Sequence, residues 1–141
     1  MNAETPVWKT VAVLTGRLIF AAVFIMAVSF KFFDMAGTAR FIAAAGFPMS
    51  TLLAWLAAVL ELVLIAGFLT GAFFTEVTLV AAIYVVFLGL AFHGPGHWAT
   101  NQNEFGFFVD HFTFLAGLLF AAAHGPGTVL TLRISRPSKS G

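Results

Sequence analysis

The stretch from Val11 to Phe33 constrains this chain more than any other, because its 23 residues are largely apolar and carry only two charges, Arg17 and Lys31. A helix of about 20 apolar residues spans the hydrocarbon core of a bilayer. An arginine inside such a helix is costly to place in lipid and needs a partner or a polar cavity. The stretch therefore predicts a membrane-spanning helix, and it raises the question of what Arg17 contacts.

Three further apolar segments follow, at about residues 51–70, 73–92 and 105–123. The chain is 60% hydrophobic and only 9% charged, whereas a soluble domain carries roughly a quarter charged residues. A tight turn at Gly71 joins the second and third segments, so these two must run antiparallel. The sequence predicts an all-α fold: a polytopic membrane protein with four transmembrane helices in one antiparallel bundle, forming a single domain over residues 1–141.

The connector at residues 34–50 has helix signals of its own. Thr38 can cap a short helix that runs to Ala45, Gly46 can stop it, and Pro48 blocks its continuation. We therefore expect a short interfacial helix between the first and second membrane helices.

The basic residues predict the orientation in the membrane. Four spans place both termini on one side, and that side holds more cations than the other: Lys9, Arg17, Arg133, Arg136 and Lys139 against Lys31 and Arg40. Cytoplasmic segments carry the excess of Lys and Arg. Both termini, including the basic tail at 128–141, are therefore predicted to be cytoplasmic.

Depth along the helices predicts how the charged residues pair. Arg17 lies six residues into its segment, roughly 9 Å deep, and Glu61 lies nine residues from the end of its own, roughly 14 Å deep from the same side. A long arginine side chain can close that difference, which predicts an Arg17–Glu61 pair. Asp110 is the predicted partner of Lys31, since both lie at the outer ends of their helices.

The predicted Arg17–Glu61 pair has two interpretations. In one, the two residues only neutralise each other and tie two helices together. In the other, they line a polar pocket for a ligand, such as a quinone head group, or a path for protons. The sequence leaves both open.

His93 and His111 are secondary candidates, at the facing ends of the third and fourth segments. Two histidines between helices could hold a metal ion or haem. No H-x-x-E-H motif or close histidine spacing accompanies them, so neither a metal nor haem is favoured. The chain has no cysteine and a net charge of +1, which argues against disulfides, cysteine-held iron–sulfur clusters and nucleic-acid binding.

Several short motifs occur in a fixed order along most of the chain. They are Gly16-Arg17, Ser29-x-Lys31, FIAAAGFP at 41–48, Glu61 within LELVLIAGFLTG, and Gly125-Pro126-Gly127. With these motifs the chain resembles the DoxX family of small four-helix bacterial membrane proteins, which is related to the DoxD subunit of a thiosulfate:quinone oxidoreductase. The resemblance implies a bundle in the bacterial inner membrane, with Arg17, Lys31 and Glu61 as the positions of interest. It departs after residue 127, where Thr128-Val129-Leu130 replaces a Ser-Leu-Asp-like ending.

The function favoured at this point is that of a membrane subunit or anchor of a respiratory or redox complex, with quinone contact near Arg17 and Glu61. The chain has no cofactor motif and little hydrophilic mass for an active site of its own. The alternatives are a quinone-reactive oxidoreductase component, of the thiosulfate:quinone type, and a small proton- or solute-conducting protein. The expected partners are the lipid bilayer and either a redox-complex protein or further copies of the chain.

Overall fold

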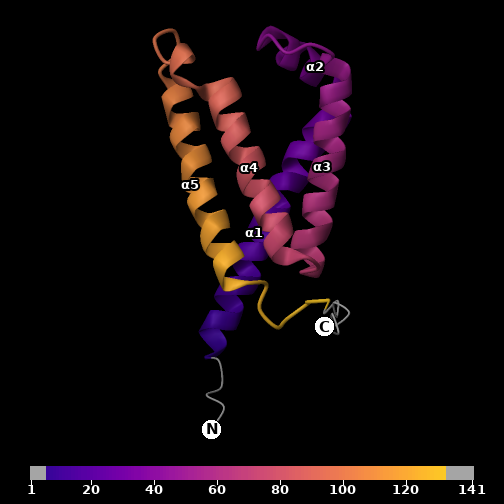
Figure 1. Ribbon diagram of the computed structural model, residues 1–141, viewed down its shortest axis with the longest axis vertical. Helices are drawn as coiled ribbons and strands as arrows, with labels where there is room; N and C mark the ends of the chain where they lie inside the picture. Colours follow the sequence, from indigo (N-terminus) through magenta and orange to yellow (C-terminus); the bar gives the residue numbers. More distant parts are fainter. Residues whose placement is uncertain (1–5, 133–141) are drawn as a thin grey trace, which may run out of the picture.

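The computed structural model describes residues 6–132, which form five α-helices and one short 3-10 helix (Figure 1). The helices are α1 (Val7–Phe33), α2 (Met35–Ala44), α3 (Ser50–Thr70), α4 (Phe74–His93), η1 (Pro95–His97) and α5 (Asn103–His124). Helices α1, α3, α4 and α5 are each long and apolar enough to cross a membrane. The predicted all-α fold, with four long helices and a short one between the first two, is confirmed.

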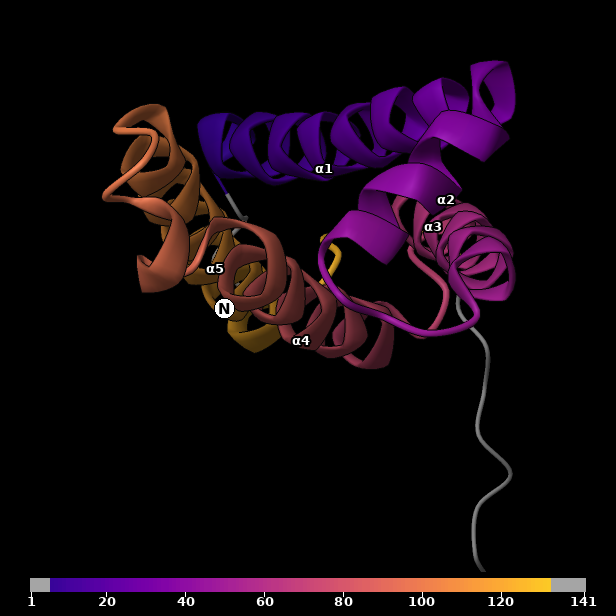
Figure 2. The ribbon, with the colours of Figure 1, turned by 90° about the horizontal axis from the view of Figure 1, so that it is seen from above.

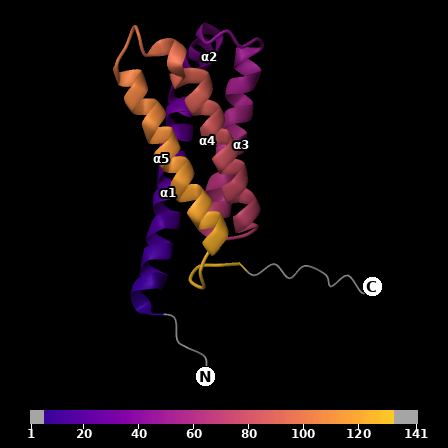
Figure 3. The ribbon, with the colours of Figure 1, turned by 60° about the vertical axis from the view of Figure 1, so that its left-hand side comes forward.

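The long helices run up and down, and α2 lies across one end of the bundle (Figures 1 and 2). The described chain begins and ends at the opposite end of the bundle, which we call the terminal end; the other is the α2 end (Figure 3). Side chains of α2 pack on α3, with Ala39 and Ile42 buried beside Ala54. Helix α1 starts at the terminal end, whereas α5 starts at the α2 end.

Asp34 separates α1 from α2. Its carboxylate Oδ1 accepts a hydrogen bond from the backbone N–H of Gly37 at 2.7 Å, so Asp34 is the N-cap of α2. An aspartate suits this position because its oxygen satisfies an N–H that has no partner within the helix. The short helix begins at Met35, and the prediction that Thr38 caps it was wrong.

Glycine brings α3 and α4 together near the terminal end. A Cβ atom on Gly67 would lie only 2.5 Å from Cγ2 of Val77, so the missing side chain allows α4 to approach closely. Gly71 then adopts a left-handed conformation, with φ of +67°, and its N–H bonds to the carbonyl of Gly67 at 2.8 Å. This conformation strongly favours glycine, and it turns the chain straight into α4.

The core of the bundle is aromatic and aliphatic. Phe24 and Phe68 stack with ring centroids 5.9 Å apart, and Phe20 and Phe114 pack against them. Leu64 and Leu118 are fully buried beside these rings. The core thus joins α1, α3 and α5 at mid-height.

The outward faces of the long helices are also apolar. Large side chains such as Val59, Ile83 and Phe120 are 55%, 72% and 78% exposed. Soluble proteins rarely expose apolar surface of such extent. These faces therefore contact the lipid bilayer.

Candidate functional site

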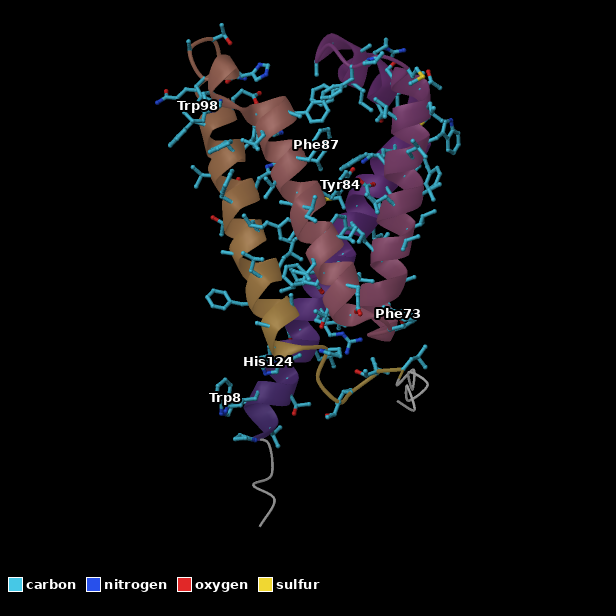
Figure 4. All side chains as sticks on the ribbon, in the orientation of Figure 1. Trp8, Phe73, Tyr84, Phe87, Trp98 and His124 are labelled. Atoms are coloured by element: carbon cyan, nitrogen blue, oxygen red, sulfur yellow. The ribbon has the colours of Figure 1, made fainter. Side chains whose placement is uncertain are left out.

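Lys31, Glu61 and Tyr84 form a polar cluster between α1, α3 and α4, in which Glu61 is buried and Lys31 and Tyr84 are partly buried. Lys31 Nζ lies 2.8 Å from Glu61 Oε1, and the Tyr84 hydroxyl donates to the same oxygen at 2.9 Å. Figure 4 shows Tyr84 on the side of α4 that faces α3. A charge-assisted hydrogen bond between buried partners is stronger than a neutral one, so Glu61 fixes the positions of both donors.

Glu61 itself is 1% exposed, and its second oxygen, Oε2, has no hydrogen-bond partner within residues 6–132. A buried carboxylate oxygen without a donor is unfavourable. Such an atom is suited to carrying a proton or to accepting a hydrogen bond from a further group.

The predicted Arg17–Glu61 pair is wrong, and the direction of side chains explains why. In a helix each Cα–Cβ bond tilts toward the helix N-terminus. Helix α1 starts at the terminal end and α3 starts at the α2 end, so Arg17 and Glu61 lean away from each other. Lys31, also on α1, leans back toward Glu61, with its Nζ 3.4 Å from the carbonyl of Ala27 one turn earlier.

Arg17 instead binds backbone oxygens at the terminal end. Its guanidinium donates to the carbonyls of Phe68 and Leu69 at the end of α3, both at 3.1 Å. It also holds the segment after α5, donating to the carbonyls of Pro126, Val129 and Leu130 at 2.8–2.9 Å and to the Thr131 hydroxyl at 3.2 Å. These six contacts occupy all five N–H donors of an arginine. Arg17, which is 2% exposed, therefore has a structural role, because it holds the end of α3 and the segment after α5 together.

The predicted Lys31–Asp110 pair is also wrong. Lys31 forms its ion pair with Glu61, and Asp110 lies on an exposed face of α5. Within residues 6–132 Asp110 makes no hydrogen bond or ion pair. The two residues share a depth in the bundle but not a direction around their helices.

His93 and His111 do come together, with ring centroids 5.0 Å apart. His93 Nδ1 lies 2.5 Å from Oε2 of Glu104, and His111 Nδ1 lies 2.7 Å from the carbonyl oxygen of Phe107. A carbonyl can only accept, so His111 Nδ1 carries the proton and its Nε2 is an acceptor or ligand atom. Across residues 6–132 no three His, Cys, Asp or Glu side chains are grouped as a metal site would require.

One cavity of about 210 Å³ lies in the α2 half of the bundle. Lys31, Tyr84, His93 and His111 line it, and Ile42, Leu88 and Phe92 are among its apolar walls. A further cavity of about 430 Å³ adjoins it at His93 and reaches Asn101 of the α4–α5 connection and Glu104 in the first turn of α5. The arrangement joins a buried polar cluster to the α2 end of the molecule through His93.

Tyr84 was not anticipated as part of the site. It is the only tyrosine of the chain and lies in a wholly apolar stretch of α4. A lone hydroxyl in such a stretch needs a partner, so it was a usable signal.

Comparison with known proteins gives a family. The DoxX family profile matches residues 12–94, more than half of the chain. No curated protein and no solved structure matches the chain. The matched region contains Lys31, Glu61, Tyr84 and His93, while His111 and Glu104 lie beyond it. The chain belongs to the DoxX family.

Proposed function

We propose that this protein is a quinone-binding membrane subunit of a respiratory or redox complex. The single observation that carries the proposal is the cavity lined by Lys31, Tyr84, His93 and His111. Polar groups meet there on one side of an otherwise apolar chamber within the span of the helices. Ligand sites typically combine apolar walls with a few convergent polar groups.

The size and polarity of the cavity fit a quinone head group. An apolar cavity of about 150 Å³ accepts one benzene ring, so about 210 Å³ accommodates one substituted ring. The ammonium group of Lys31 has three donors, and its contacts with Glu61 and Ala27 use two of them. The remaining donor of Lys31 can bond to a ring oxygen of the head group, and the acceptor nitrogen of His111 can bond to a hydroxyl of its reduced, quinol form.

The acid–base groups supply a path for protons. A bound quinone supplies coupled transfer of electrons and protons. Glu61 orients Lys31 and Tyr84 and keeps one buried oxygen without a donor. His93 contacts Glu104, which borders the cavity at the α2 end. Protons taken up in the buried cluster can leave through His93 and Glu104.

The proposal places the protein in the bacterial plasma membrane with both termini in the cytoplasm. Lys9 and Arg17 lie near the terminal end, and Lys31 and Arg40 lie toward the α2 end. The tail cations Arg133, Arg136 and Lys139, on which the orientation also depends, lie outside the described residues. A partner protein would supply the electrons.

Quinone binding by the purified chain in lipid nanodiscs tests this function. We would measure Kd for short-chain ubiquinone and menaquinone analogues by equilibrium dialysis. His111→Leu removes an acceptor from the cavity, so it should weaken binding of the reduced, quinol forms of the analogues about three- to tenfold, the effect of one lost hydrogen bond. Ser29→Ala is the control, because Ser29 bonds only to the Ile25 carbonyl of its own helix.

The outcomes separate clearly. Absence of wild-type binding to either analogue, or an equal loss in Ser29→Ala, would contradict the proposal. Steady quinone turnover by the purified chain with an artificial electron donor would instead show that it is the oxidoreductase itself.

A further inference from the structure

A second cavity adjoins the polar one, and its walls are apolar. It measures about 340 Å³ and lies between α2, α3 and α4. Leu53, Leu56 and Leu60 of α3 and Phe87 and Leu88 of α4 line it, and Tyr84 is its one polar lining residue. We call this space the apolar arm.

The apolar arm shares a wall with the polar cavity. Ala57, Tyr84 and Leu88 border both spaces. The Tyr84 hydroxyl bonds to Glu61, so the ring of this residue stands between the polar cluster and the apolar arm. The two spaces are therefore neighbours, one lined by the polar groups and the other by apolar side chains, with Tyr84 at their shared wall.

The apolar arm reaches the outer surface of the bundle. Leu56 is 55% exposed and Phe87 is 47% exposed. Figure 1 shows α3 and α4 close together at the terminal end and further apart toward α2, and Figure 4 shows Phe87 on the part of α4 where they have separated. Because the outer faces of both helices contact lipid, the arm opens to the interior of the bilayer.

We infer that the apolar arm binds the hydrocarbon tail of the ligand whose head group occupies the polar cavity, an inference that rests on the proposed function. The ligand class is then a quinone with a polyprenyl tail, which enters sideways from the membrane between α3 and α4. At the volume per carbon of a benzene-filled cavity, about 340 Å³ holds roughly a dozen carbon atoms, or about two isoprene units. Longer tails continue past Leu56 and Phe87 into the lipid.

This arrangement predicts that affinity depends on the first isoprene units and then levels off. A tail that enters from the bilayer leaves lipid and not water, so its gain comes from close van der Waals contacts with the walls of the arm. Units beyond the mouth of the arm remain in lipid and add nothing.

The test compares ubiquinone analogues with no tail, one isoprene unit and two isoprene units, bound to the purified full chain in nanodiscs. Partition of each analogue into protein-free nanodiscs is subtracted. Wild type should bind the two-unit analogue at least about threefold more tightly than the tail-less one. Leu56→Trp fills the mouth of the arm and should lose most of this gain, while its affinity for the tail-less analogue stays within about twofold.

Leu62→Trp is the matched control. Leu62 is also on α3 and is 45% exposed, but it does not border the apolar arm. It should keep the full dependence on tail length. Equal loss in both tryptophan variants, or an unchanged gain in Leu56→Trp, would overturn the inference while leaving the proposed function intact. Absence of binding to every analogue by wild type would instead overturn the proposed function.

A second measurement covers the case in which Leu56→Trp fails to fold. A two-unit analogue with a photoreactive group at the end of its tail is bound to wild type and irradiated. Labelled peptides should contain residues 53–60 or 84–88, which line the arm. Labelling confined to α1 or α5 would overturn the inference.

Discussion

Lys31 and Tyr84 both donate to one oxygen of Glu61, and the other oxygen is buried without a donor among the described residues. Lys31→Met would leave this carboxylate facing Tyr84 alone. Removing one partner of a buried ion pair destabilises a protein by about 3–5 kcal/mol. We expect a loss of this size in the free energy of unfolding, measured by detergent titration of the purified protein.

The double variant Lys31→Met/Glu61→Gln removes both charges and should be less destabilised than the sum of the two single variants. Arg17→Met combined with Glu61→Gln is the control, since these residues do not touch and their effects should add to within about 0.5 kcal/mol. If the destabilisation of the Lys31→Met/Glu61→Gln variant equalled the sum of the two single variants, this would contradict the structure.

Asp110 presents the opposite case, an acidic side chain on an exposed face of a membrane helix with no partner in residues 6–132. Aspartate at the centre of a membrane helix is unfavourable by up to about 3 kcal/mol, and less toward the ends. Asp110→Asn should therefore leave the melting temperature in nanodiscs unchanged or raise it. A clear drop would show that another chain neutralises Asp110.

Among the helices and their connections, the segment after α5 depends on a single side chain. Arg17 holds the carbonyls of Pro126, Val129 and Leu130, and the N–H of Leu132 then bonds to the carbonyl of Thr70 at 2.8 Å. Arg17→Met removes the donors to all three of these carbonyls at once and leaves the Leu132 bond alone. We expect residues 127–132 to lose protection in hydrogen exchange and the free energy of unfolding to fall by more than about 3 kcal/mol.

The control for this change is Lys9→Met, which removes an exposed cation from the same helix. It should leave exchange in residues 127–132 unaltered. Retained protection in Arg17→Met would mean that the segment is held by something other than the guanidinium.

The contact between α3 and α4 is set by Gly67. A Cβ there would lie 2.5 Å from Val77 Cγ2, so Gly67→Ala must push the helices apart and should cost about 1–3 kcal/mol of stability. Gly16→Ala has nothing within 4 Å of the added atom. It should be neutral or slightly stabilising, because alanine favours helix more than glycine does. Thermal unfolding of both variants checks the difference, and equal effects would count against the close contact.

The apolar segments predicted the helices well because membrane spans need only length and hydrophobicity. Lys31 and Glu61 were also recognisable, since charges inside such spans are rare. Their pairing was not recognisable, because depth along the helix axis does not determine contact. Arg17 is at a suitable depth for Glu61, but its side chain leans away from it. Asp110 is at a suitable depth for Lys31, but it lies on a different face of its helix.

At the scale of the whole molecule, the two ends of the bundle differ. At the terminal end Arg17 binds the segment after α5, and the α2 end contains the polar cavity, the apolar arm and the His93–Glu104 contact. Trp8 and Trp98 lie near opposite ends (Figure 4), as expected for side chains at the two membrane interfaces. The proposed site would therefore exchange protons with the side of the membrane that α2 faces.

Which side this is can be measured directly, because the chain contains no cysteine. Asn101→Cys places a thiol on the exposed α4–α5 connection at the α2 end, and Thr128→Cys places one at the exposed terminal end. If the cation bias sets the orientation, a membrane-impermeant maleimide should label Asn101→Cys in intact cells and Thr128→Cys only after permeabilisation. The reverse pattern would place the α2 end in the cytoplasm, so that protons leaving through His93 and Glu104 would be released inside the cell rather than outside. Labelling of both variants in intact cells would mean that α5 does not cross the membrane in one fixed direction.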